Sequence, residues 1–272
     1  MPSARPASTW LLLVRAGHPE PTVAVTVITA LLAWSAGSDL RSGALVTAAV
    51  FTGQLSIGWS NDLIDAGRDR AVHRADKPLA TGSLAGSTVA GAVVAALVAC
   101  VVLSLLCGVR SGLTHLLLGV GSGWAYNLGL KRTRWSWAPY AVAFATLPAV
   151  VSLAVDPSWL PPLWLMLAGG LLGVGAHLVN ALPDLADDEA TGVRGLPQLL
   201  GRRTSQRLAT AVLVTASVVA FVGPATRPPA WCWVGLLVVL ALAGVALRAP
   251  GRIAFHATVA IATVNVVMLV AR

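Results

Sequence analysis

The sequence predicts an all-α, polytopic membrane protein that crosses the bilayer nine times. Hydrophobic residues make up 56% of the 272 residues and charged residues only 11%, whereas a soluble domain carries roughly 25% charged residues. Apolar windows of about 20 residues, the length that spans a bilayer as a helix, recur from one end of the sequence to the other. No long polar stretch marks a second domain, so residues 1–272 are expected to form a single membrane domain.

Nine apolar segments define the expected spans. In chain order they cover residues 12–35, 42–60, 86–107, 113–130, 138–155, 161–182, 207–223, 230–248 and 253–271. Each has the continuous hydrophobicity of a transmembrane helix. The first apolar run, residues 10–14, is interrupted by Arg15 and is too short for the core of a signal peptide, so no processing is expected.

The distribution of cations predicts the orientation of these spans. With nine crossings, 15 of the 19 Lys and Arg residues fall on one face, in loops between spans and in the N-terminal region with Arg5. Cytoplasmic loops of membrane proteins carry the excess of cations. We therefore expect a multi-pass cell-membrane protein whose N-terminus and basic loops are cytoplasmic and whose C-terminus lies outside. Arg134, Arg203 and Arg207 are interpreted as markers of this topology only.

The net charge of +8 does not indicate nucleic-acid binding. On a soluble protein such a charge would suggest a nucleic-acid partner. Here the cations lie in short loops, and the sequence has neither a basic stripe nor an aromatic platform on which bases could stack. The expected surroundings are therefore a lipid bilayer and no nucleic acid.

The acidic residues are concentrated in two short windows that share one pattern. Eight of the 11 Asp and Glu residues fall there, and each window contains the motif N-x-x-x-D-x-x-x-D. The motif residues are Asn61, Asp65 and Asp69 in the first window and Asn180, Asp184 and Asp188 in the second. Four expected spans separate the copies, so both should open cytoplasmic loops on the same face. Carboxylates at the margin of a membrane helix are costly and indicate function.

These motifs predict a magnesium and phosphate site. A spacing of four places the polar groups of each motif on one helical face. Carboxylate and amide oxygens, with no Cys or paired His, suit Mg²⁺, which shares its coordination sites with substrate phosphate. Four nearby cations are candidates for contacts with a diphosphate that two Mg²⁺ ions would bridge. These cations are Arg70, Lys77, Lys131 and Arg194.

The remainder of the substrate is expected to be apolar, because a diphosphate at the mouth of a helical bundle would have lipid-like walls behind it. An isoprenyl diphosphate combines these features, and loss of its diphosphate would generate an allylic cation. Aromatic faces stabilise such cations, and Trp59, Trp124 and Tyr126 are placed near the cytoplasmic ends of expected spans. Trp and Tyr also form interfacial belts in most membrane proteins, so both interpretations of these side chains stay open.

The quoted residues resemble the UbiA superfamily of intramembrane prenyltransferases. The stretch 61–70 is similar to the first aspartate motif of that family, and 76–82 is similar to its Arg-Pro-Leu tail, with Lys77 in place of Arg. Residues 126–132 resemble its Tyr-x-x-x-x-Lys element, and 184–201 resemble the second motif with its downstream loop. The second loop departs from the family pattern because it lacks the usual Lys-Thr pair, and the loops are short for a dedicated acceptor site.

The resemblance implies nine helices around a central cavity, capped by cytoplasmic loops, and Mg²⁺-dependent transfer of a prenyl group to an aromatic or other lipophilic acceptor. The aspartates Asp65, Asp69, Asp184 and Asp188, together with the two motif asparagines, would hold the metal ions. A second group of residues would contact the diphosphate, namely Arg70, Lys77, Tyr126, Lys131 and Arg194.

Other functions share parts of this pattern. A membrane terpene cyclase, which quenches the cation within its own chain, would use the same ionising residues, and so would a phosphoribosyl transfer to a polyprenyl phosphate. A transporter would favour inverted repeats and mid-span charges, whereas this repeat is parallel and its acids lie at one face. A non-catalytic lipid-binding relative would not need both motifs intact.

Overall fold

The computed structural model describes residues 8–249 and 251–271, and every regular element there is helical. The expected cytoplasmic cation Arg5 lies outside these residues. In chain order the helices are α1 (Thr9–Ala16), α2 (Pro19–Ser35), α3 (Leu40–Ala71), α4 (Gly86–Leu106), α5 (Val109–Thr114), α6 (Gly121–Leu128), α7 (Ala138–Val155), α8 (Leu163–Ala181), α9 (Leu185–Ala190), α10 (Leu196–Leu200), α11 (Arg202–Val222), α12 (Ala230–Arg248) and α13 (Gly251–Val270). The all-α prediction is confirmed.

Six helices in the described part of the chain are long and apolar enough to cross a membrane, namely α4, α7, α8, α11, α12 and α13. The other three expected segments differ from single membrane-length helices. Segment 12–35 is divided between α1 and α2, 42–60 lies inside the longer α3, and 113–130 passes through α5, a π-helix (His115–Val120) and α6. The chain is a multi-pass membrane protein, and the expected total of nine crossings stays a prediction.

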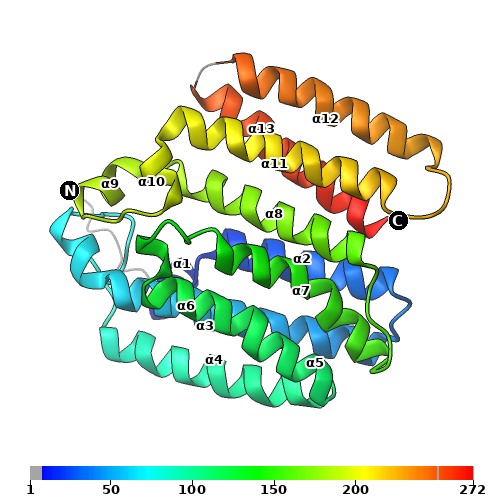
Figure 1. Cartoon of the computed structure of the whole chain (residues 1–272). Helices are drawn as coiled ribbons and strands as arrows, with labels where there is room; N and C mark the ends of the chain where they lie inside the picture. The colour runs from blue at the N-terminus through cyan, green and yellow to red at the C-terminus, as the bar shows by residue number, and fades with distance from the viewer. Residues whose placement is uncertain (1–7, 250, 272) are drawn as a thin grey trace.

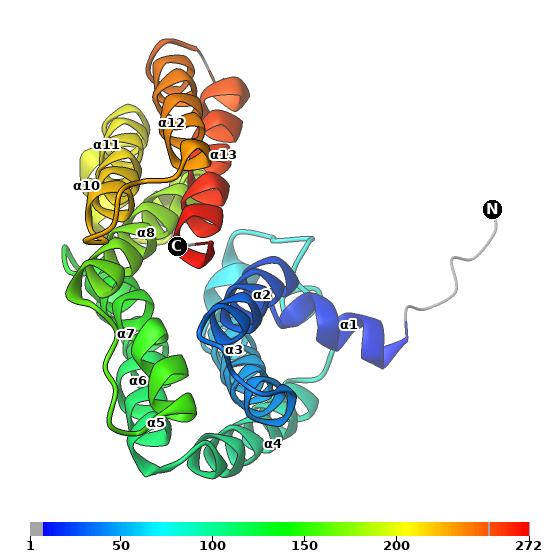
Figure 2. The ribbon, with the colours of Figure 1, turned by 90° about the vertical axis from the view of Figure 1, so that its right-hand side faces the viewer.

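The break between α1 and α2 has a local cause. His18 has a positive φ of 49°, a conformation that a helix interior does not contain. Pro19 follows as the first residue of α2, a position where its missing N–H costs no hydrogen bond. The corner therefore turns the chain and leaves α1 projecting away from the bundle (Figure 2).

The two largest apolar cores of the bundle lie in different parts of it. One apolar core joins α8, α11, α12 and α13 around fully buried residues such as Leu213, Val239 and Ile261. A second joins α2, α3 and α7 to the end of α13 around Val46 and Val150. Outward-facing side chains on α4 and α12 are exposed and apolar, as expected of surfaces that lipid covers.

The two acidic windows lie at the same end of the bundle. Figure 1 places α9, α10 and the segment that follows α3 together at one end, with the C-terminus at the opposite end. The 32 residues of α3 extend about 48 Å at 1.5 Å per residue, well beyond the roughly 30 Å hydrocarbon core. The last turns of α3, with the first motif, therefore reach past the apolar layer. We call the end of the bundle that contains α9, α10 and the last turns of α3 the site end.

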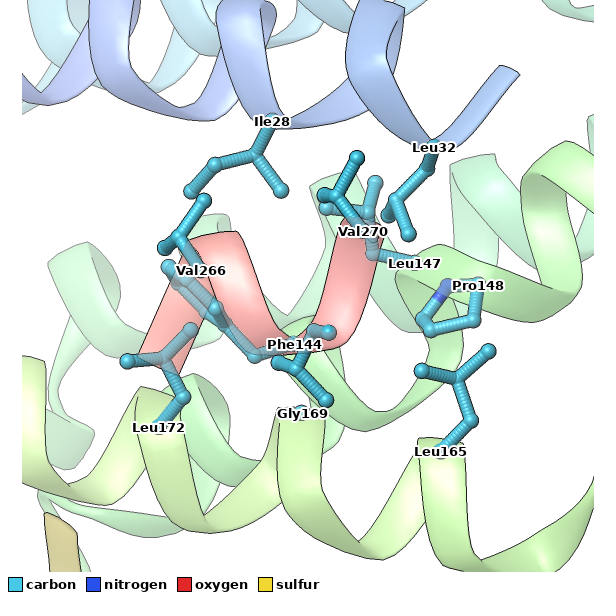
Figure 3. Close-up of a pocket in the computed structure, with 11 residues that line it drawn as sticks. Ile28, Leu32, Phe144, Leu147, Pro148, Leu165, Gly169, Leu172, Val266 and Val270 are labelled. Atoms are coloured by element: carbon cyan, nitrogen blue, oxygen red, sulfur yellow. The ribbon is translucent and has the colours of Figure 1, made fainter. Parts of the chain in front are cut away.

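An apolar pocket with a volume of about 20 Å³ lies between α2, α7, α8 and α13, farther from the site end. Figure 3 shows Ile28, Leu32, Phe144 and Leu172 among the side chains around it. This pocket is a small unfilled space in the apolar interior. The expected central cavity stays a prediction.

Candidate active site

The first motif lies on the final turns of α3, where the helix is continuous. Asp65 and Asp69 are buried, as is Asp62. Asn61 is not directed at these carboxylates, because its Nδ2 donates a hydrogen bond to Asn127 Oδ1 at 2.9 Å. Asn127 in turn donates to Ile57 O and Ser60 Oγ. Asn61 therefore ties α3 to α6 in this structure.

The second motif does not lie on one continuous helix, and the prediction of a single polar face is wrong here. Asn180 lies in the last turn of α8, which ends at Ala181, and Asp184 caps the short helix α9. Pro183 lies between them. Proline has no backbone N–H and its ring obstructs the preceding turn, so α8 stops and the chain turns before Asp184 and Asp188.

Arg68 joins the two motifs. Its Nη2 donates to Asp65 Oδ2 at 2.9 Å, and its Nε lies 3.8 Å from Asp69 Oδ1. Its Nη1 lies 3.9 Å from Asp188 Oδ1 on α9 and is buried with no hydrogen-bond partner among the described residues. One guanidinium thus lies between two carboxylates of the first motif and one of the second, which is distant in sequence.

Arg74 makes a second link to α9. Its Nε and Nη2 each donate to a carboxylate oxygen of Asp76 at 2.9 Å, while Nη1 donates to Asp184 at 3.1 Å and to Asp187 at 3.5 Å. The bidentate hydrogen bond from Arg74 lowers the pKa of Asp76 to about 2. The same pair, with Asp184 and Asp187, raises the pKa of Arg74 above its ordinary value.

Two of the predicted cations contact carboxylates of the first window. Lys131 is buried, and its Nζ donates to both oxygens of Asp65 at 2.6 and 2.7 Å. Lys77 instead contacts Asp62, with 2.6 Å between Nζ and Oδ1. The same oxygen lies 2.8 Å from His18 Nε2, so the α1–α2 corner is held against α3.

The other two predicted cations are not brought to the carboxylates. Arg70 and Arg194 are both exposed, and no hydrogen bond or ion pair joins either side chain to another residue in the part of the chain that the structure describes. Their contacts with a diphosphate stay a prediction.

On α9, Asp188 is partly buried and accepts a hydrogen bond from Gln198 Nε2 at 2.7 Å. Burial raises the pKa of this carboxyl.

An aromatic group lies beside the carboxylates. Tyr126 contacts Tyr140 edge-to-face with 5.3 Å between ring centroids, and His177 with 5.8 Å. His177 Nε2 lies 3.0 Å from Ser136 Oγ. A Cβ at Gly173 would collide with the carbonyl oxygen of Tyr140, so this glycine permits the close α7–α8 packing that positions the ring.

Sequence reasoning missed the residues that organise this site, namely Arg68, Arg74, His18, Asp62 and Gln198. Arg68 could have been found, because residues three apart on a helix are neighbours and Arg68 follows Asp65 by three. The contacts of Arg74 and Gln198 depend on the α8–α9 corner and leave no such local signal.

The donor set suits Mg²⁺ shared with a phosphate group. Its members are hard oxygen ligands, and Arg68 and Lys131 now supply the positive charge that these carboxylates require. Among residues 8–249 and 251–271 no three Asp, Glu, His or Cys side chains are close enough to hold an ion by themselves. Mg²⁺ commonly uses one or two carboxylates plus substrate phosphates and water, so the site fits an ion that arrives with its substrate.

Known proteins share this sequence pattern and fold. The sequence model described as "UbiA prenyltransferase family" matches residues 22–266. The bacteriochlorophyll synthase 33 kDa chain of Cereibacter sphaeroides is 33% identical over 176 residues, which cover 61% of this chain and 55% of that protein. The corresponding Rhodobacter capsulatus chain is 29% identical over 192 residues, covering 64% and 60%. The matches thus span less than two thirds of the length of either relative.

Solved structures share the overall fold. A UbiA homolog from Archaeoglobus fulgidus bound to DMAPP and Mg²⁺ superposes with a TM-score of 0.68 at 15% identity, covering 95% of this chain and 98% of that one. The apo UbiA homolog from Aeropyrum pernix K1 gives a TM-score of 0.74 at 16% identity, covering 93% and 98%. At these identities the likeness concerns the fold.

Proposed function

The chain belongs to the UbiA prenyltransferase family, and we propose that it is a Mg²⁺-dependent enzyme that transfers the prenyl group of an isoprenyl diphosphate to a lipophilic acceptor. We further propose that the site end faces the cytoplasm of the cell, as the cation distribution predicts. The single domain would extend over residues 1–272.

One observation carries the proposal, namely that carboxylates from both motifs converge on the Arg68 guanidinium. Asp65, Asp69 and Asp188 all lie within 4 Å of it. Carboxylates that converge repel one another, and Arg68 compensates part of that charge in the structure without a bound ion. A cluster of carboxylates with a mostly buried guanidinium at its centre is suited to bind a diphosphate together with divalent ions.

Asp65, Asp69, Asp184 and Asp188 would hold the magnesium ions. Asn61 is less directly placed, because it is bonded to Asn127, whereas Asn180 would contribute from the last turn of α8. When bound, Mg²⁺ would neutralise the diphosphate and make it a better leaving group. The metal ions would then neutralise the carboxylates, and the cations that now contact these carboxylates would be free to bind the diphosphate.

The cations of the site would take over the diphosphate. Lys131 and Arg68 now contact Asp65 at 2.6 and 2.9 Å, so small side-chain movements would direct them to phosphate oxygens beside the same carboxylates. Arg74 would remain a bridge between the loop after α3 and α9. Arg70 and Arg194, which are exposed, would reach the diphosphate only from the solvent side.

The aromatic group and the bundle interior would receive the prenyl portion. Tyr126 and Tyr140 lie next to the carboxylates, where an aromatic face stabilises an allylic cation. Farther in, the apolar pocket beside Phe144 (Figure 3) shows that the interior between α2, α7 and α8 does not fill completely. An isoprenyl chain extending from the site would meet apolar walls.

Transfer to a separate acceptor is favoured over internal cyclisation by one observation. The relatives from Cereibacter sphaeroides and Rhodobacter capsulatus are both bacteriochlorophyll synthase chains, which supports a separate lipophilic acceptor. A terpene cyclase of the same fold is the second candidate, since the ionising residues would be identical.

The proposal is tested with purified protein and geranyl, farnesyl and geranylgeranyl diphosphates, each with Mg²⁺ and candidate acceptors. We expect diphosphate release that requires Mg²⁺ and a product carrying the prenyl group, identified by mass spectrometry. Asp188→Asn should lose at least about 100-fold in rate, whereas Glu189→Gln on the exposed side of α9 should retain activity. Products formed equally well without acceptor would favour the cyclase, and absence of Mg²⁺-dependent release would refute both.

A further inference from the structure

A second basic site lies in a hollow of about 890 Å³ at the site end, and its lining reaches Pro183, the residue before Asp184. It is formed where α11 begins, α12 ends and α13 begins. Five arginines line it, namely Arg202, Arg203, Arg207, Arg248 and Arg252, and the described residues that line it include no Asp or Glu. All five arginines are exposed.

The charge of these arginines is not neutralised within the described chain. No ion pair joins any of the five to a described carboxylate, and Arg248 donates only to the backbone carbonyl of Gly244 at 3.2 Å. At the carboxylate cluster, by contrast, Arg68 and Arg74 are each matched by acids. Like charges gathered in one hollow repel one another. An anion bound there would reduce this electrostatic repulsion.

Helix ends reinforce the positive field. The first residue of α11 is Arg202 and the first residue of α13 is Gly251, and both positions line the hollow. The N-terminus of each helix carries unpaired backbone N–H groups and the positive end of the helix dipole. The C-terminus of α12 lies in the same hollow and opposes this field, so the preference for phosphate comes mainly from the five guanidinium groups and is assisted by the two N-terminal ends.

The surroundings of the hollow determine which anion fits. The three helices α11, α12 and α13 are each long and apolar enough to span a membrane, so their ends lie near the level of lipid headgroups. Exposed apolar side chains continue outward from the rim, among them Leu247 and Ile253. A ligand that occupies both regions needs a phosphate group next to hydrocarbon chains.

We propose that this hollow binds the phosphate headgroup of an anionic phospholipid. The guanidinium groups contact the phosphate, and the acyl chains lie along the exposed faces of α12 and α13. A preference of cytoplasmic loops for cations explains how many arginines these loops contain. It does not explain why arginines from three helices line the same hollow, whereas a bound headgroup does.

Native mass spectrometry of the full chain in detergent tests this proposal. The probes are phosphatidylglycerol and phosphatidylcholine with the same acyl chains, and each lipid is titrated against the protein. A cation near an anionic headgroup contributes about a five-fold change in affinity, so Arg203→Gln combined with Arg207→Gln should weaken phosphatidylglycerol binding roughly 25-fold. The control combines Arg132→Gln with Arg134→Gln, which removes the same charge from exposed positions in the loop before α7.

The expected result is that the wild-type protein retains phosphatidylglycerol in preference to phosphatidylcholine and that only the α11 variant loses this preference. Equal retention of the two lipids by the wild type would overturn the proposal without any variant, so a variant that fails to fold does not leave it undecided. Equal losses in the two double variants would also overturn it. Inorganic phosphate or geranyl diphosphate that displaces the lipid at matched ionic strength would reassign the hollow to a free anion or to the active site.

Discussion

Replacement of Arg68 by glutamine should destabilise the protein without magnesium and make it unusually responsive to magnesium. The guanidinium lies 2.9 Å from Asp65, 3.8 Å from Asp69 and 3.9 Å from Asp188. At an effective dielectric constant of about 20, each of the two longer pairs corresponds to about 4 kcal/mol of Coulomb attraction. The side chain is mostly buried, so desolvation offsets much of this gain.

Removing one partner from a buried ion pair costs about 3–5 kcal/mol. Asp65 keeps Lys131 at 2.6 Å, so we take the lower end, about 3 kcal/mol. For a chain of this size that loss corresponds to a decrease in melting temperature of about 6–12 °C. Mg²⁺ should restore part of the loss, because a divalent ion can take the place of the guanidinium among the carboxylates.

The assay is thermal unfolding in detergent, followed by differential scanning fluorimetry over a series of Mg²⁺ concentrations. The matched control is Arg70→Gln, two residues away on the same helix, where the side chain is exposed and has no described partner. We expect its melting temperature without Mg²⁺ to stay within about 2 °C of the wild type. An Arg68→Gln protein that melts with the wild type, or that gains no more from Mg²⁺ than the control does, would refute the role assigned to this guanidinium.

Three further predictions follow from the site geometry. Lys131→Met should lower the rate of diphosphate release at least about 100-fold, because it removes the ammonium group that contacts Asp65 and would bind the diphosphate. The rate is measured at saturating Mg²⁺ with Arg132→Gln as the control, and a rate above one tenth of wild type would contradict the prediction. Lys77→Met leaves the buried Asp62 with His18 alone and should lower the melting temperature by several degrees, and an unchanged melting curve would contradict it. Burial raises the pKa of Asp188, so this carboxyl takes up a proton at a higher pH than an ordinary aspartate does, and both Mg²⁺ affinity and rate should fall as the pH decreases through that raised pKa; a Mg²⁺ affinity that stays constant down to pH 4 would contradict it.

The sequence was sufficient to predict the helical membrane fold, because long apolar segments have few alternatives in a bilayer. It also predicted that both carboxylate motifs lie at one end of the bundle. An even number of crossings between Asp65 and Asp184 was enough for this prediction, because it returns the chain to the same face of the membrane. The structure brings the two windows to the same site end (Figure 1).

The detailed contacts were less predictable, for physical reasons. Pro183 ends α8 inside the second motif, so a spacing of four did not give one helical face there. Arg70 was assigned a role by its position after Asp69, yet rotation along α3 turns it outward and turns Arg68 toward the carboxylates. Lys77 forms an ion pair with Asp62, and this contact depends on how the loop after α3 folds back. The expected contact of Lys77 with a diphosphate stays a prediction.

Whether the two motifs act on one diphosphate is decided by a double-mutant cycle of binding. Geranyl thiolodiphosphate, an unreactive analogue, is titrated calorimetrically with Mg²⁺ into the wild type, Asp69→Asn, Asp188→Asn and the double variant. If both carboxylates serve one ligand, the double variant should bind about as weakly as the weaker single variant, leaving a coupling free energy above about 1 kcal/mol. An analogue affinity that either single variant leaves unchanged would show that only one motif holds the diphosphate and would contradict this arrangement.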